Sequence, residues 1–153
     1  MKEPVFSRIL KYMLYAAFVV GLVGAATLPF TIDRFFFIFR TAASLMPGYR
    51  AAILPFLMAV AVPCLWVVLE MIFMLNTIPA QPFVMRNVKA LYRIGVIFFV
   101  LAAAFFLWCI FYYFSIVIFA GGFLVVGSGL FAFTLSELIR AAVVLRTENE
   151  LTI

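Results

Sequence analysis

The chain has 153 residues, of which 69% are apolar and only 11% carry a charge. A soluble domain is nearer half apolar, with about a quarter of its residues charged, so this composition excludes an ordinary water-soluble fold. The apolar runs are continuous and about twenty residues long, which predicts membrane-spanning helices; a membrane β-barrel would show shorter, alternating segments. We therefore predict an all-α integral membrane protein with a single domain.

Four spans are predicted in chain order, at about residues 12–30, 52–75, 94–114 and 116–138. Between the first two, residues 31–50 hold Phe and Ala near helical spacing, which predicts a short amphipathic helix in the membrane interface. A packed loop is the alternative. Residues 76–93 form a polar connector and residues 139–153 a polar tail. Within the second span, Pro55 and Pro63 are expected to bend the helix.

The distribution of Lys and Arg predicts the orientation, because basic residues gather on the cytoplasmic side of a membrane. The N-terminal lead, the connector and the C-terminal stretch hold 3, 3 and 2 of them, whereas the 31–50 loop holds 3 and the turn near residue 115 none. Both chain ends and the connector are therefore predicted in the cytoplasm. The net charge of +5 has the same explanation. Direct nucleic-acid binding is not expected, since no basic face with interleaved aromatic residues lies outside the spans.

Small residues often mark helix contacts in membranes. Two stripes at four-residue spacing occur, in the first and fourth spans: Ala17, Gly21, Ala25 and Ser128, Ala132, Ser136. Either stripe could close the bundle or join two subunits, so a homodimer is one of the expectations. Near the outer end of the third span, Trp108, Tyr112 and Tyr113 are typical of an interfacial aromatic belt.

Three ionisable residues fall near the inner ends of the spans: Glu70, Glu137 and Arg140. A charge at the bilayer centre costs about 2.5–3.5 kcal/mol on insertion scales, and less towards the interface. Glu137 and Arg140 are three residues apart, so they should pair on one helical face. Together the three residues are a candidate polar site at the cytoplasmic mouth, for a cation, a proton or a partner. The alternative is that the carboxylates simply reach up to the headgroups.

No arrangement typical of catalysis is present. The chain has no histidine, which excludes a histidine-based triad or zinc site, and its two cysteines, Cys64 and Cys109, fall inside apolar spans. We predict no catalytic residues, no metal site, no cofactor and no enzymatic activity.

Two motifs resemble a bacterial membrane family, Domain of Unknown Function 2975. The segment PFVMRNVKALYRIG (82–95) resembles the family's "pF...Nvk.Lr.ig" pattern, and LRTENELTI (145–153) resembles its "lk.EndLTv" ending. The matching residues are Pro82, Phe83, Asn87, Val88, Lys89, Leu91, Ile94, Gly95, Glu148, Asn149, Leu151 and Thr152, with Glu150 in place of the usual aspartate. The resemblance covers residues 51–153, and the 31–50 loop matches nothing in the family.

The resemblance implies four spans in a bacterial inner membrane, often with a small helix-turn-helix regulator encoded nearby, and no catalytic residues. The leading hypothesis is a regulatory or accessory protein that binds a cytoplasmic partner through residues 82–93 and 145–153. Its candidate contacts are Arg86, Asn87, Lys89, Arg93, Glu148, Asn149, Glu150 and Leu151. The alternation of the last residues predicts an extended tail docked on the basic connector. A small dimeric transporter or channel that uses Glu70 and Glu137 is the alternative.

Overall fold

The computed structural model of the protein describes residues 5–38, 48–77, 84–112 and 114–151. These residues form four α-helices: α1 (Val5–Ile38), α2 (Tyr49–Thr77), α3 (Met85–Phe111) and α4 (Ile116–Leu151). Each helix contains a stretch long and apolar enough to cross a membrane. The predicted all-α fold with four candidate spans is therefore confirmed.

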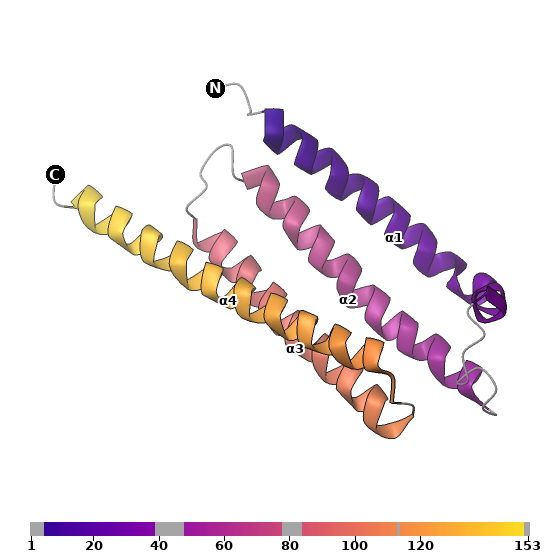
Figure 1. The fold of residues 1–153 in the computed structure, drawn as a ribbon. Helices are drawn as coiled ribbons and strands as arrows, with labels where there is room; N and C mark the ends of the chain where they lie inside the picture. The colour runs from indigo at the N-terminus through magenta and orange to yellow at the C-terminus, as the bar shows by residue number, and fades with distance from the viewer. Residues whose placement is uncertain (1–4, 39–47, 78–83, 113, 152–153) are drawn as a thin grey trace.

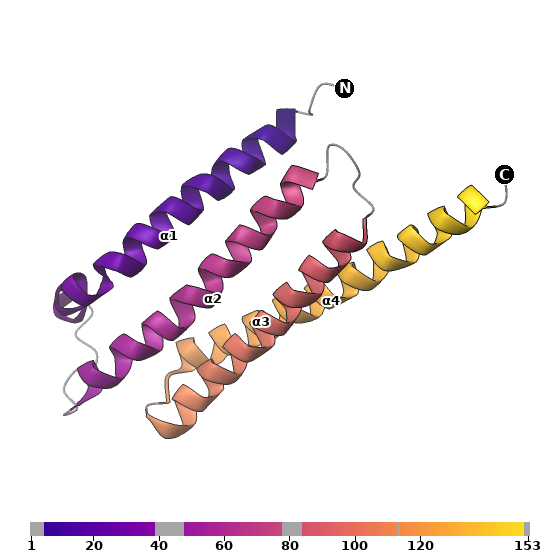
Figure 2. The same cartoon turned by 180° about the vertical axis from the view of Figure 1, so that it is seen from behind.

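The helices run up and down and pack in chain order. The main contacts join α1 to α2, α2 to α3 and, most extensively, α3 to α4. The start of α1, the end of α2, the start of α3 and the end of α4 all lie at one end of the molecule (Figures 1 and 2). An apolar groove of about 680 Å³ is lined by residues of all four helices. The arrangement is thus an open row of helices rather than a closed four-helix bundle.

Large apolar side chains lie on the outer surface of every helix. One from each helix illustrates this, with exposed fractions between 64% and 76%: Val20, Val62, Ile110 and Val117. Water would make such a surface costly at about 25 cal/mol per Å², whereas lipid tails are as apolar as the side chains themselves. The surface therefore fits a protein that crosses the membrane several times.

Glycines let aromatic rings of the partner helix approach closely. A Cβ atom on Gly95 would lie 2.8 Å from the ring of Phe133, and one on Gly129 would lie 3.0 Å from the ring of Phe99. On α1, a Cβ atom on Gly21 would lie 3.0 Å from the side chain of Leu65. In the fourth-span stripe, Ala132 and Ser136 are buried. Parts of both predicted small-residue stripes thus close the contacts within one chain.

The first helix continues beyond the predicted span, through Ile38. Its last turns bend away from the long part of the helix (Figure 1), and Pro29 lies just before them. Proline removes a backbone hydrogen bond, and Thr27 and Thr31 donate hydroxyl hydrogen bonds to carbonyls one turn back, which also bends helices. Residues 31–38 are thus a continuation of α1. Residues 39–47 of the predicted interfacial helix lie outside the described part.

Two predictions about the third span need correction. The helix ends at Phe111, three residues before the end of the predicted span, and the backbone N–H of Tyr112 donates to the Trp108 carbonyl at 3.0 Å as the last bond of the helical series. Trp108 is only 4% exposed, and its ring lies 4.3 Å from that of Phe56 on α2. Trp108 therefore belongs to the core between α2 and α3 and not to an interfacial belt. Tyr112 is exposed at the helix end, and Tyr113 lies outside the described residues.

The prediction of an extended tail is also wrong for the residues up to Leu151. The helix α4 continues to that residue. Within it, Thr147 donates its hydroxyl to the Val143 carbonyl at 2.8 Å. Extending an existing helix avoids the unfavourable nucleation step, so even modest helix formers can follow.

Candidate functional site

The carboxylate of Glu70 is held by Arg93 across the interface of α2 and α3. The Arg93 Nε atom lies 2.9 Å from Oε1, and Nη2 donates to Oε2 at 3.0 Å. The side chain of Glu70 is only 10% exposed, while that of Arg93 is 55% exposed. A two-point contact of this kind offsets the cost of removing the carboxylate from water. The ion pair therefore joins the end of α2 to the start of α3.

Sequence reasoning missed this pair, because it treated Glu70 as a residue of the cytoplasmic mouth and Arg93 as a contact for a partner. The information was partly available: a short connector between antiparallel helices brings the end of one beside the start of the next. Both residues of the pair line a small pocket of about 220 Å³. Asn87 lines this pocket and is only 2% exposed, so it is not available on the surface as the partner hypothesis expected.

The predicted contact between Glu137 and Arg140 is present, although it is loose and exposed. The Arg140 Nη1 atom lies 3.6 Å from the Glu137 carboxylate, and the two side chains are 59% and 69% exposed, respectively. An exposed helical pair of this type contributes about 0.3–0.5 kcal/mol. The pair is therefore a surface feature of α4 and adds little to the stability of the fold.

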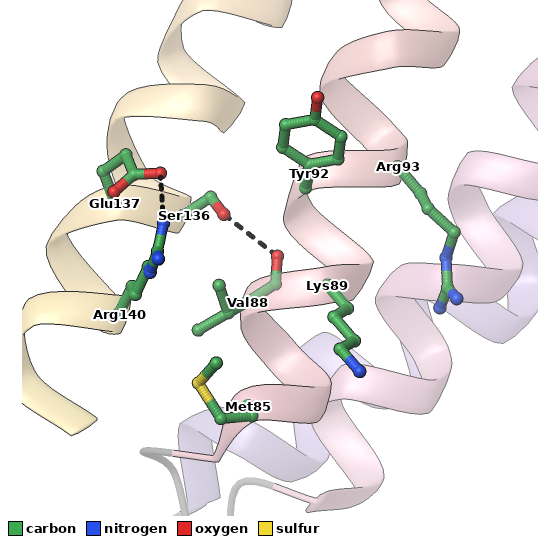
Figure 3. Close-up of a pocket in the computed structure, with 8 residues that line it drawn as sticks. All are labelled: Met85, Val88, Lys89, Tyr92, Arg93, Ser136, Glu137 and Arg140. Carbon is green, nitrogen blue, oxygen red and sulfur yellow. Dashed lines mark hydrogen bonds and ion pairs between the residues drawn. The ribbon is translucent and has the colours of Figure 1, made fainter. Parts of the chain in front are cut away.

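A cleft of about 440 Å³ lies between the start of α3 and the opposite part of α4, and we call it the α3–α4 cleft (Figure 3). The Ser136 hydroxyl, which is buried, donates to the Val88 carbonyl at 3.0 Å and joins the two helices there. Glu137 lines this cleft, whereas Glu70 lines the pocket between α2 and α3, so the two glutamates do not share a site. The residues that line the α3–α4 cleft are Met85, Val88, Lys89, Tyr92, Arg93, Ser136, Glu137 and Arg140.

The other predicted partner contacts lie at the same end of the molecule. Arg86 and Lys89 are exposed on the first turns of α3, and Glu148 is exposed on the last turns of α4. From the contact with Val88, α4 runs 12 residues from Ser136 to Glu148, or about 18 Å. Helix α3 extends back only to Met85, so the yellow end of α4 projects alone beyond it (Figure 1). The side chains of Asn149, Glu150 and Leu151 lie outside the described part.

No protein-family model, curated protein or solved structure matches the chain. Within the described residues, no group of three or more His, Cys, Asp or Glu side chains could hold a metal ion. The charged side chains described above fall into two groups, one between α2 and α3 and one around the α3–α4 cleft. One carboxylate is firmly paired inside the fold, and several cations lie around an open cleft.

Proposed function

We propose that the protein is a multi-pass protein of a bacterial inner membrane that binds a soluble cytoplasmic protein in a regulatory or accessory role. The observation that supports this proposal is the length of α4. It has 36 residues, or about 54 Å, whereas a hydrocarbon core of about 30 Å needs only about 20 residues. The additional residues lie at the C-terminal end of α4, which extends beyond the start of α3.

The projecting end of α4 has a surface suited to recognition. Val144 and Leu145 are 46% and 60% exposed, and Arg146 and Glu148 lie exposed beside them. Val144 and Glu148 are four residues apart and share one face of α4, and a partner that binds a helical segment uses anchors spaced in this way. Because this segment is already helical, little ordering entropy opposes binding. The exposed cations of α3, Arg86 and Lys89, extend the candidate surface.

The proposal also includes the orientation of the chain, with both ends in the cytoplasm, and its location in a bacterial inner membrane. Eight of the eleven Lys and Arg residues lie near the ends and the connector, which supports a cytoplasmic location for these parts. The motifs at 82–95 and 145–153 support membership of the Domain of Unknown Function 2975 family. Both motifs contribute residues to the proposed surface.

The transporter hypothesis has less support. Transporters place their coupling charges near the bilayer midplane. Glu70 instead lies in the last two turns of α2, and Glu137 lies just beyond the first 20 residues of α4, so neither is near the midplane. The two carboxylates line pockets on different sides of α3, and each has an arginine partner.

Cysteine labelling tests the orientation. In a chain without Cys64 and Cys109, single cysteines at Gly48 or Phe114 should react with an impermeant maleimide in intact spheroplasts. Cysteines at Met85 or Glu148 should react only after the membrane is permeabilised, because the positive-inside rule keeps these sites in the cytoplasm. Labelling of position 85 or 148 in intact spheroplasts would overturn the proposed orientation.

Site-specific photo-crosslinking tests the partner. A photoreactive residue at Leu145 should form an adduct with a soluble protein in living cells, since this side chain lies on the projecting end. The same residue at Leu130, which is similarly exposed but lies within the span, is the matched control and should give no such adduct. Removal of residues 145–153 should leave insertion and helical content intact and abolish the partner's association with the membrane. Equal results at the two positions would refute the proposed surface.

A further inference from the structure

We propose that the α3–α4 cleft binds the phosphate headgroup of an anionic phospholipid. The cleft lies between two helices and opens at the surface of the protein (Figure 3). Helix α3 contributes Lys89 and Tyr92, and α4 contributes Arg140. Basic pockets between membrane helices are a known type of headgroup site. The inference depends on the membrane assignment and not on the cytoplasmic partner proposed above.

The charges around the cleft favour an anion. Three cations and one carboxylate line it. Arg93 points away from Glu137 and Arg140 (Figure 3). Its charge is balanced by Glu70 on α2. Lys89 forms no ion pair with any residue that the structure describes. Its ammonium group points away from Arg140 in Figure 3, and its flexible four-carbon stem lets it turn towards an anion in the cleft.

Arg140 can also turn towards a ligand. Its contact with Glu137, at 3.6 Å, is longer than a hydrogen bond. A guanidinium has five N–H donors, and phosphate oxygens accept them in pairs. A phosphate in the cleft would therefore gain charged hydrogen bonds from Arg140 without breaking a tight internal one.

The cleft lies at the depth where headgroups are found. About 20 residues of helix cross the hydrocarbon core. Counted back from the end of α3 at Phe111, the core reaches Tyr92; counted forward from the start of α4 at Ile116, it reaches Leu135. Lys89 and Arg140 lie just outside these limits, at the level of lipid phosphates.

An apolar surface continues from the cleft towards the membrane centre. On α3, Val96 and Phe99 follow Tyr92 at helical spacing and are 42% and 38% exposed. The ring of Phe133 on α4 lies 5.2 Å from that of Tyr92 and 5.6 Å from that of Phe99. This aromatic surface can contact an acyl chain while the phosphate lies in the cleft. A free phosphate ion would use none of it, so the combination favours a lipid.

Native mass spectrometry of the full chain in detergent tests the inference. With equal amounts of phosphatidylglycerol and phosphatidylcholine of the same acyl chains, we expect preferential retention of phosphatidylglycerol. The double variant Lys89→Gln/Arg140→Gln should lower its affinity roughly 25-fold, at about fivefold for each cation near an anionic lipid. The control Arg8→Gln/Arg86→Gln also removes two exposed cations, but neither lines the cleft, and it should bind nearly as tightly as the parent chain.

The outcomes separate the alternatives. Equal retention of both lipids by the parent chain, or an equal loss in the two double variants, would mean that the cleft is not a headgroup site. If inorganic phosphate displaces phosphatidylglycerol at millimolar concentration and protects the protein from heat equally well, the site takes a soluble anion and the lipid assignment is wrong. Thermal unfolding in phosphatidylcholine nanodiscs confirms that each variant is folded before its binding is compared.

Discussion

Replacing Arg93 by Met is expected to destabilise the helical fold by about 2–4 kcal/mol. The reason is that Glu70, whose side chain is only 10% exposed, loses both contacts of its carboxylate. Removing one member of a fully buried pair costs about 3–5 kcal/mol, and we place the value lower because the Arg93 side chain is 55% exposed. Thermal unfolding of the purified protein, followed by circular dichroism, measures the effect.

Arg140→Met provides the matched control. It also removes one arginine from an ion pair at the same end of the protein, but its pair is loose and exposed on both sides. Its cost should be about 0.5 kcal/mol or less. In the background of Glu70→Gln, Arg93→Met should cost much less than it does alone, because the remaining group is uncharged. Equal losses in the two single arginine variants would contradict the assignment of Glu70 and Arg93 as a structural pair.

The spans could be predicted from the sequence because they depend on quantities that are local. An apolar run of about twenty residues is sufficient to identify a membrane helix, whatever its neighbours are. The ends of the helices depend on finer effects. The alternating pattern of the last residues predicts an extended tail, yet the Thr147 hydroxyl donates to a carbonyl of the preceding turn, and α4 continues to Leu151.

The arrangement of the charges was only partly predictable. The contact of Glu137 with Arg140 lies within one helix, where a spacing of three residues brings side chains together. The contact of Glu70 with Arg93 depends on how α2 and α3 are rotated about their axes, which no local spacing determines. The same rotation turns Asn87 inwards and leaves Lys89 exposed, although both belong to the same motif.

The second large loss of stability is expected at Gly95, where α3 packs against the aromatic ring of Phe133 on α4. We expect Gly95→Val to destabilise the protein by about 1–3 kcal/mol, as overpacking does. A Cβ atom at this position would lie 2.8 Å from two ring atoms of Phe133. The ring has little freedom to move aside, because it lies against Tyr92 on one side and Phe99 on the other.

Gly127 is the control for Gly95, since it lies in α4 with nothing within 4 Å of its added Cβ atom. Gly127→Ala should therefore be neutral or stabilise the fold by up to about 1 kcal/mol, through higher helix propensity. Adding Phe133→Ala to Gly95→Val should recover part of the loss, because the smaller side chain makes room for the valine. If Gly95→Val and Gly127→Ala have the same thermal stability, the close approach of α3 and α4 at Phe133 is wrong. Because Phe133 also contacts Tyr92 in the α3–α4 cleft, Gly95→Val should weaken the retention of phosphatidylglycerol as well, whereas Gly127→Ala should not.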